Sequence, residues 1–234
     1  MILHTLLITL MPILFKYPIT CRLKKDGVTS LLMIHQIISR RLPCRYVIIV
    51  DKAVFDGVYN KEFARSLAEY EFQGENRLKK AVNELSKVVE KNAIIPFLME
   101  HKEQVLNAMQ YKADRAIIVA ALYNSAFPFS YEEVCILGKY FHVQDQVSRK
   151  LLEEKISEIY GFNKAISNAI DYSIPTLVEA GFIERPSAGI YTRPSLNATT
   201  EIALATYRES FFLNNPLLSR NNDYDGSPYF EFVR

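Results

Sequence analysis

Apolar residues recur every three or four positions through most of the chain between residues 61 and 141, and this spacing constrains the fold more than any other feature. Phe63, Leu67 and Tyr70 are one example, and Leu78, Val82 and Leu85 begin a second. Such spacing places side chains on one face of a helix, whereas a strand exposed on one face requires strict alternation. The 234 residues include only 8 Gly and 10 Pro, few for an all-β chain with many tight turns. The sequence therefore predicts a mainly α fold.

The helices predicted between residues 61 and 142 are amphipathic and separated by short connections. Gly74 interrupts the pattern, Pro96 begins a third helix, and Lys112–Ala126 is a fourth that ends before Pro128. Ser130 with Glu133 three residues later matches a capping box, which predicts that a fifth helix begins there and continues to about residue 141. These helices predict a bundle whose charged residues, including Glu132 and Glu133, face the solvent.

The first 60 residues carry a basic charge and no helical periodicity. They contain eight Lys and Arg against three Asp, a net charge of +5 in a chain whose total is +2. Arg45–Val50 (RYVIIV) is a short, largely β-branched run and predicts a strand, whereas Leu31–Ile38 fits a helix or a strand. A basic segment on a near-neutral body is compatible with a polyanionic partner, and it also arises by chance.

The first fifteen residues, Met1–Phe15, have no charged side chain and are interrupted by Pro12. They are too short to cross a hydrocarbon core of roughly 30 Å as a helix. They also lack the basic start and cleavage site of a secretory signal. Three interpretations remain: a buried element, a short anchor on a membrane surface, or a start upstream of the natural one. We expect no membrane span.

The sequence contains no motif for a catalytic, cofactor or metal site. Phosphate-binding glycine loops, the nucleophile elbow and the H-E-x-x-H zinc motif are all missing. Cys21, Cys44 and Cys135 are widely spaced, which predicts reduced thiols in a cytoplasmic protein without disulfides. The weak candidates for a nuclease site are Asp51, Asp56 and Glu62, for which residues without a catalytic role are the better interpretation. We expect a protein that is not an enzyme and has no cofactor or metal.

Residues 146–194 contain residues that typically end helices, followed by residues that favour strands, in a defined order. Val147, Leu151, Leu152 and Ile156 mark a helix that ends at Gly161, where a helix favours glycine. Asn163 then caps a second helix, and an apolar face predicts that this helix continues to Ala180-Gly181. That face consists of Ile166, Ala169, Ile170, Ile174, Leu177 and Val178. The pair Phe182-Ile183, a turn at residues 187–189 and the run at residues 190–193 predict a small β-hairpin.

This order resembles a winged helix-turn-helix over Gln146–Pro194. The phrase LVEAGFIER, residues 177–185, is similar to the ending that follows recognition helices in that superfamily. The resemblance implies a helical bundle followed by a C-terminal winged helix that binds double-stranded DNA, as a transcriptional regulator or an accessory subunit of a DNA-processing or defence system. Its implied contacts are polar residues of the second helix and two arginines beside the wing turn. They are Asn163, Lys164, Ser167, Asn168, Asp171, Tyr172, Arg185 and Arg193.

Two features depart from this resemblance. Pro175 lies inside the proposed recognition helix, which it either kinks or restarts, with Ser173 as the new cap. From residue 139 to residue 193 there are seven Lys and Arg and seven Asp and Glu. A neutral module neutralises few phosphates, so affinity would need segregated charges, the basic N-terminal part or a homodimer. The alternative is a protein-interaction or scaffold module.

The pattern divides the chain into four parts. Residues 1–60 form an N-terminal segment, 61–142 a helical bundle, 143–214 a winged-helix-like domain and 215–234 a C-terminal tail. Within the third part, residues 199–214 form one more helix. In the tail, the D-x-D-G sequence at residues 223–226 lacks the ligands of a calcium loop and predicts a turn. Residues 229–233 (YFEFV) predict a terminal strand or an apolar clamp.

Overall fold

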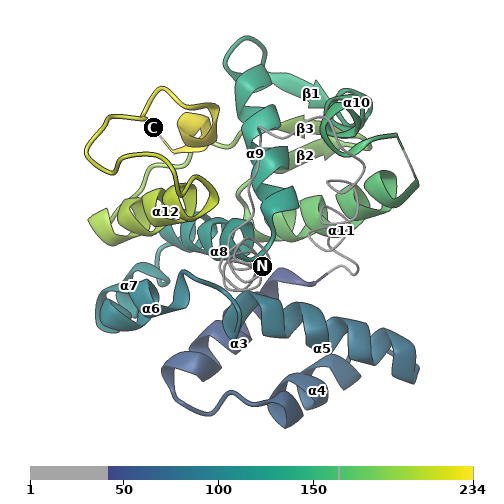
Figure 1. Cartoon of the computed structure of the whole chain (residues 1–234), viewed down its shortest axis with the longest axis vertical. Coiled ribbons are helices and arrows are strands. Elements are labelled where there is room, and N and C mark those ends of the chain that lie inside the picture. Colours follow the sequence, from purple (N-terminus) through teal and green to yellow (C-terminus); the bar gives the residue numbers. More distant parts are fainter. Residues whose placement is uncertain (1–41, 163, 234) are drawn as a thin grey trace, which may run out of the picture.

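The structure, a computed structural model, describes residues 42–162 and 164–233 and is mainly helical with one small antiparallel sheet. Figure 1 shows α9 upright in the middle, the sheet towards one end, and α3, α4 and α5 at the other. In chain order the elements are α3 (Cys44–Phe55), α4 (Lys61–Glu69), α5 (Glu75–Val89), α6 (Ile95–Glu100), α7 (Lys102–Ala108), α8 (Lys112–Ala126), α9 (Pro128–Phe141), β1 (Gln146–Ser148), α10 (Arg149–Tyr160), α11 (Lys164–Ala180), β2 (Glu184–Ser187), β3 (Ile190–Thr192), α12 (Glu201–Asn214) and the 3-10 helix η1 (Pro228–Phe232).

Helix α8 lies at the centre of the core. Every residue from Ala116 to Asn124 is buried, as expected for a helix that is apolar nearly all round. It packs against α12, α11, α9, α5 and α3. One cluster of buried residues extends from Leu42 to Phe232 and therefore crosses the boundaries predicted at residues 60, 142 and 214.

The predicted strand at Arg45–Val50 is wrong, because this run lies within α3. The buried positions Val47, Asp51 and Phe55 are four residues apart, so one face of a helix is covered by α5, α8 and α11. Packing on one side outweighs the β preference of a short branched run, since that preference depends on context. The third predicted helix also differs, because α6 and α7 are separate short helices that meet at His101. Leu31–Ile38 and Met1–Phe15 lie outside the described residues.

Helix α9 corrects two further predictions. It begins at Pro128, with Phe127 as its N-cap, so Ser130 is not a cap; the Ser130 hydroxyl donates to Asn124 Oδ1 at 2.8 Å. Glu132 and Glu133 are buried rather than solvated. The reason is that α9 is enclosed by α8, α10, β1 and η1, which a one-sided helical pattern does not reveal.

The last residues of the chain pack on α9 as the 3-10 helix η1, not as a strand. Tyr229, Phe230 and Phe232 are buried in the common core, which fits the apolar-clamp alternative. Gly138 of α9 makes this close approach feasible, because a Cβ there would lie 1.9 Å from the carbonyl oxygen of Pro228. The helix predicted at residues 199–214 is confirmed as α12.

Candidate nucleic-acid interface

Residues 146–192 form two helices and a three-stranded antiparallel sheet of order β1-β3-β2. Val147, predicted on a helix, instead lies in β1 opposite Tyr191 of β3. Ser148 caps α10 by accepting a hydrogen bond from the Leu151 backbone N–H at 3.2 Å. The helix ends at Gly161, as predicted, and its φ of +87° is a conformation that favours glycine. The sequence therefore predicts the two helices and the hairpin but not the strand β1.

Helix α11 runs from Lys164 to Ala180 without a break, and Pro175 lies inside it. Its buried face includes Ile166, Ile170 and Leu177, as the apolar pattern predicts. The C-terminal half is fixed to the start of α3: the Thr176 hydroxyl donates to the Leu42 carbonyl at 2.5 Å. Continuous packing on both sides of Pro175 accounts for a helix that tolerates one missing backbone donor.

The predicted contact residues of α11 fall into different environments. Lys164, Asn168 and Asp171 are exposed, Ser167 and Tyr172 are half-buried, and Asn163 lies outside the described residues. Within the described part of the chain, the side chains of Lys164 and Asn168 make no hydrogen bond or ion pair. They are separated by four residues and so share one outward face of the helix.

Arg149, which the sequence reasoning did not single out, joins α10, α11 and the wing. Its Nη2 lies 2.9 Å from both Asp171 Oδ1 and Ser167 Oγ, and its Nη1 lies 2.6 Å from Glu153 Oε2. Its backbone N–H donates to the Gly189 carbonyl in the turn between β2 and β3, at 2.7 Å. Ser167 and Asp171 are therefore occupied within the fold. Four polar partners around one arginine position α11 relative to the hairpin.

The two wing arginines also differ. Arg185 in β2 is exposed, and among the described residues it makes no ion pair or hydrogen bond. Arg193 forms an ion pair with Glu231 of η1 and donates to the Glu231 carbonyl at 2.7 Å. His142 lies 3.3 Å from the same carboxylate. Arg193 therefore fixes the C-terminal segment to the end of β3.

Three exposed cations remain around α10, α11 and the hairpin: Lys150, Lys164 and Arg185, none of which is in an ion pair among the described residues. The carboxylates of the same region are more often neutralised. Asp171 and Glu153 pair with Arg149, and Glu158 pairs with Lys155. The balanced charge of the sequence is thus partly segregated, because several acids are neutralised by neighbours while these three basic groups face the solvent.

The buried acids offer no assembled metal or nuclease site. Of the three weak nuclease candidates, Asp51 is buried, whereas Asp56 and Glu62 are exposed. In the described ranges, no three His, Cys, Asp or Glu residues are placed to hold a metal ion. Burial raises the pKa of Asp51 and of Glu132 to about 7, and raises that of Glu133 well above its usual range.

The Cys44 thiol does not resemble an activated nucleophile. Cys44 and Cys135 form no disulfide among the described residues, and Cys21 lies outside them. Burial raises the pKa of the Cys44 thiol to about 11, so it remains protonated at neutral pH. Among the residues that the structure describes, no helix has both the length and the apolar character to cross a membrane.

Comparison with known proteins gives no relative from which a function could be transferred. No protein-family model, curated protein or solved structure matches the chain.

Proposed function

We propose that residues 128–193 form a winged helix that binds double-stranded DNA, with α11 as the recognition helix and the β2–β3 hairpin as the wing. The observation that carries the proposal is the order α9, β1, α10, α11, β2, β3 together with the sheet order β1-β3-β2. In a winged helix the second helix of the turn motif enters the major groove and the hairpin lies beside it. Helix α10 ends at Tyr160 and α11 begins at Lys164, a spacing that fits the short connection of a helix-turn-helix.

Lys164 and Asn168 are the proposed groove residues. Both project from the N-terminal part of α11, which is the part that contacts base edges in such motifs. The amide of Asn168 presents the donor and acceptor that read adenine, and Lys164 binds a phosphate or a guanine edge. Arg185 at the wing binds the backbone. Ser167 supports Arg149 in this proposal, and Arg193 supports η1.

The test is a fluorescence-anisotropy titration of the full chain with a random duplex at several salt concentrations. Each phosphate neutralised contributes about −0.9 to the slope of log affinity against log salt. Lys164→Ala/Arg185→Ala is therefore expected to make that slope less steep by about 1.8.

A matched control removes the same charge elsewhere. Arg77→Ala/Lys80→Ala takes two exposed cations from α5, outside residues 128–193, and is expected to leave the slope nearly unchanged. Equal losses in the two double variants would mean that overall charge, not this interface, attracts the duplex. Absence of duplex binding at low salt would refute the proposal.

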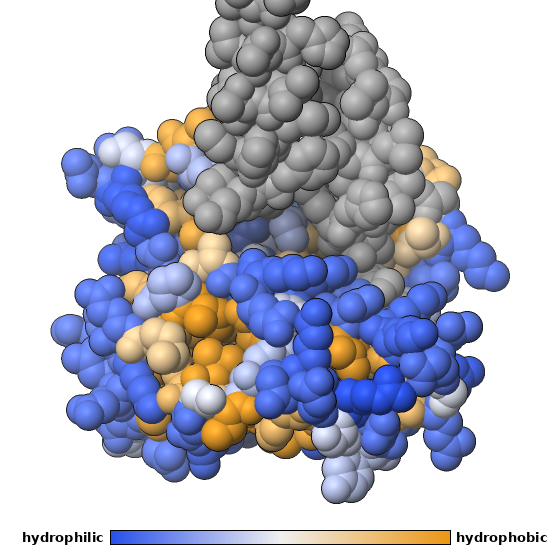
Figure 2. Space-filling model, turned by 60° about the horizontal axis from the view of Figure 1, so that its bottom comes forward, coloured by the Kyte–Doolittle hydropathy of each residue, from blue (hydrophilic) through white to orange (hydrophobic). Residues whose placement is uncertain are grey.

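A protein-interaction module is the second candidate, favoured by exposed apolar surface at the other end of the molecule. Figure 2 looks onto that end and shows apolar residues gathered within a hydrophilic surround. Exposed large apolar side chains of this end include Ile49 of α3 and Val58, which follows that helix. Apolar surface rimmed by polar residues often marks a protein contact.

This second candidate is tested by affinity capture with the wild-type chain and with Ile49→Gln/Val58→Gln. A partner retained by the wild type and lost from the variant supports an interaction module. A partner retained equally by both, or no partner, counts against this surface. The matched control is Leu217→Gln, which removes a side chain that is 95% exposed after α12.

A further inference from the structure

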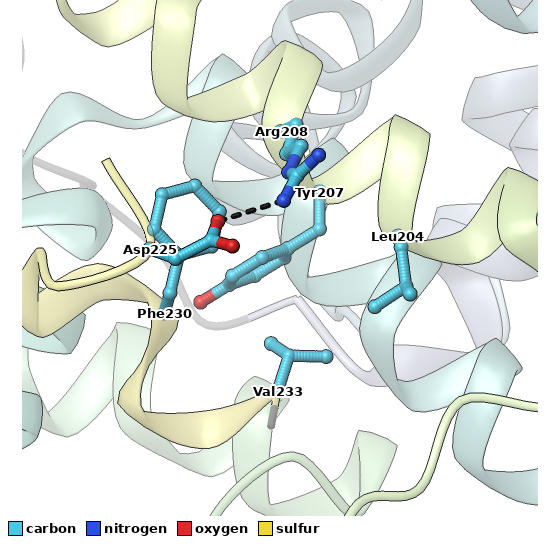
Figure 3. A pocket seen from close by; sticks show the side chains of 6 residues that line it. All are labelled: Leu204, Tyr207, Arg208, Asp225, Phe230 and Val233. Atoms are coloured by element: carbon cyan, nitrogen blue, oxygen red, sulfur yellow. Dashed lines mark hydrogen bonds and ion pairs between the residues drawn. The ribbon is translucent and has the colours of Figure 1, made fainter. Parts of the chain in front are cut away.

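A cavity of about 210 Å³ lies between α12 and the C-terminal segment (Figure 3). Its walls come from two parts of the chain that are separate from the proposed DNA interface. Three lining residues belong to α12, and three belong to the segment that follows it. They are Leu204, Tyr207, Arg208, Asp225, Phe230 and Val233.

The aromatic part of the wall is fixed by contacts behind it. The Tyr207 hydroxyl donates to the Tyr229 carbonyl at 2.8 Å, and the two rings stack with centroids 4.3 Å apart. Phe230 meets the Tyr207 ring edge-on, with centroids 5.8 Å apart. Because these rings are held in place, the apolar wall exists without a ligand, as is usual for small-molecule sites.

The polar side of the cavity is a single exposed ion pair. Arg208 Nη2 lies 2.7 Å from Asp225 Oδ1, and the two side chains are 57% and 61% exposed. A pair this exposed contributes at most about 1 kcal/mol to stability, so it opens readily. Asp225 also shows which group Arg208 is oriented to bind, since a guanidinium and a carboxylate are complementary in shape and charge.

The size of the cavity limits the apolar part of a ligand. A dry cavity of about 150 Å³ accommodates benzene, so 210 Å³ holds one six-membered ring or a short branched chain together with a small headgroup. We propose that this pocket binds a small apolar monocarboxylate: its hydrocarbon part lies against Tyr207, Phe230 and Leu204, and its carboxylate takes the place of Asp225 on Arg208. This site does not depend on the proposed DNA binding.

The experiment is a fluorine NMR titration of the full chain with 4-fluorobenzoate, and with 4-fluorobenzamide as the neutral analogue. The carboxylate is expected to bind about tenfold or more tightly than the amide, because only it makes a charge-assisted bond to Arg208. Arg208→Gln should weaken 4-fluorobenzoate binding by about tenfold or more. Asp225→Asn should strengthen it several-fold, because it removes the competing carboxylate.

Two further variants make the result decisive. Leu204→Phe narrows the pocket from an exposed position and should abolish binding without unfolding the chain. Arg65→Gln removes an exposed, ion-paired arginine from α4 and should leave binding unchanged. The proposal is overturned if 4-fluorobenzoate shows no binding at millimolar concentration, or if it binds Arg208→Gln as tightly as the wild type.

Discussion

Asp51 makes the stability of this protein depend on pH in a direction that can be measured. Its side chain lies in α3 with 2% exposure, and burial raises its pKa from 3.8 to about 7. In the unfolded chain the carboxyl loses its proton near pH 4, whereas in the folded chain it keeps the proton up to about pH 7. Its contribution to stability is therefore fully present below about pH 4 and is lost as the pH rises to 7.

The magnitude follows from the size of that pKa change. A rise of about 3 in pKa corresponds to about 4 kcal/mol between the two protonation states. Asp51→Asn removes the titration, so its free energy of unfolding, compared with that of the wild type, should increase by about 1.4 kcal/mol per pH unit between pH 5 and pH 7. The change in this difference with pH is the useful quantity, because packing effects of the amide shift the variant equally at every pH.

The assay is urea denaturation of wild type and Asp51→Asn at a series of pH values from 5 to 8, followed by circular dichroism. The matched control is Asp56→Asn, which removes an exposed carboxyl at the end of the same helix. Because Asp56 is exposed, this variant removes a carboxyl from the end of the same helix without removing a buried one. A difference for Asp51→Asn that stays constant from pH 5 to pH 8 would refute the burial argument.

Three other perturbations test features of the core. Glu132→Gln should also gain stability relative to wild type as the pH rises towards 7, because burial raises the pKa of Glu132 to about 7; thermal unfolding at pH 5 and pH 8 measures this. Gly138→Ala should lower the free energy of unfolding, measured by urea denaturation, by roughly 1–3 kcal/mol, because the alanine Cβ would collide with the Pro228 carbonyl. Asp114→Ala should lower the free energy of unfolding by about 2–4 kcal/mol in the same assay. The reason is that the buried Asp114 carboxylate accepts hydrogen bonds from the Thr199 N–H at 2.6 Å and from the Thr200 hydroxyl.

Each of these core perturbations has an outcome that contradicts it. A stability difference for Glu132→Gln that does not vary with pH would mean that its carboxyl is solvated. Gly226→Ala is the control for Gly138→Ala, because a Cβ at residue 226 meets nothing within 4 Å; equal losses would exclude the close approach of η1 as the cause. Asp145→Ala, at an exposed position, is the control for Asp114→Ala, and similar stability of the two variants would discount the hydrogen bonds to residues 199 and 200.

Local patterns predicted the elements well where each element's own sequence determined it. The apolar spacing located α8, α11 and α12, and Gly161 marked the end of α10. The pattern failed where tertiary surroundings decide. RYVIIV is helical because α5, α8 and α11 cover one side of it, and Glu133 is buried because α9 is enclosed on several sides. Neither enclosure leaves a signal within the helix's own sequence, because the covering residues belong to other elements.

The same limit applies to the candidate interface, and it changes which residues matter there. Arg185 and Arg193 both flank the wing turn, so the sequence makes them equal candidates for DNA contact. In the structure, Arg193 pairs with Glu231, 38 residues further along the chain, whereas Arg185 has no such partner among the described residues. Ser167 and Asn168 are likewise equal candidates in the sequence, because both are polar residues of the same helix. In the structure, Arg149 donates a hydrogen bond to Ser167 but not to Asn168. A candidate contact residue must therefore be polar, and its side chain must also have no partner within the fold. Under the proposed function, that selection leaves Lys164, Asn168 and Arg185 as the positions where substitution tests DNA binding without disturbing the fold.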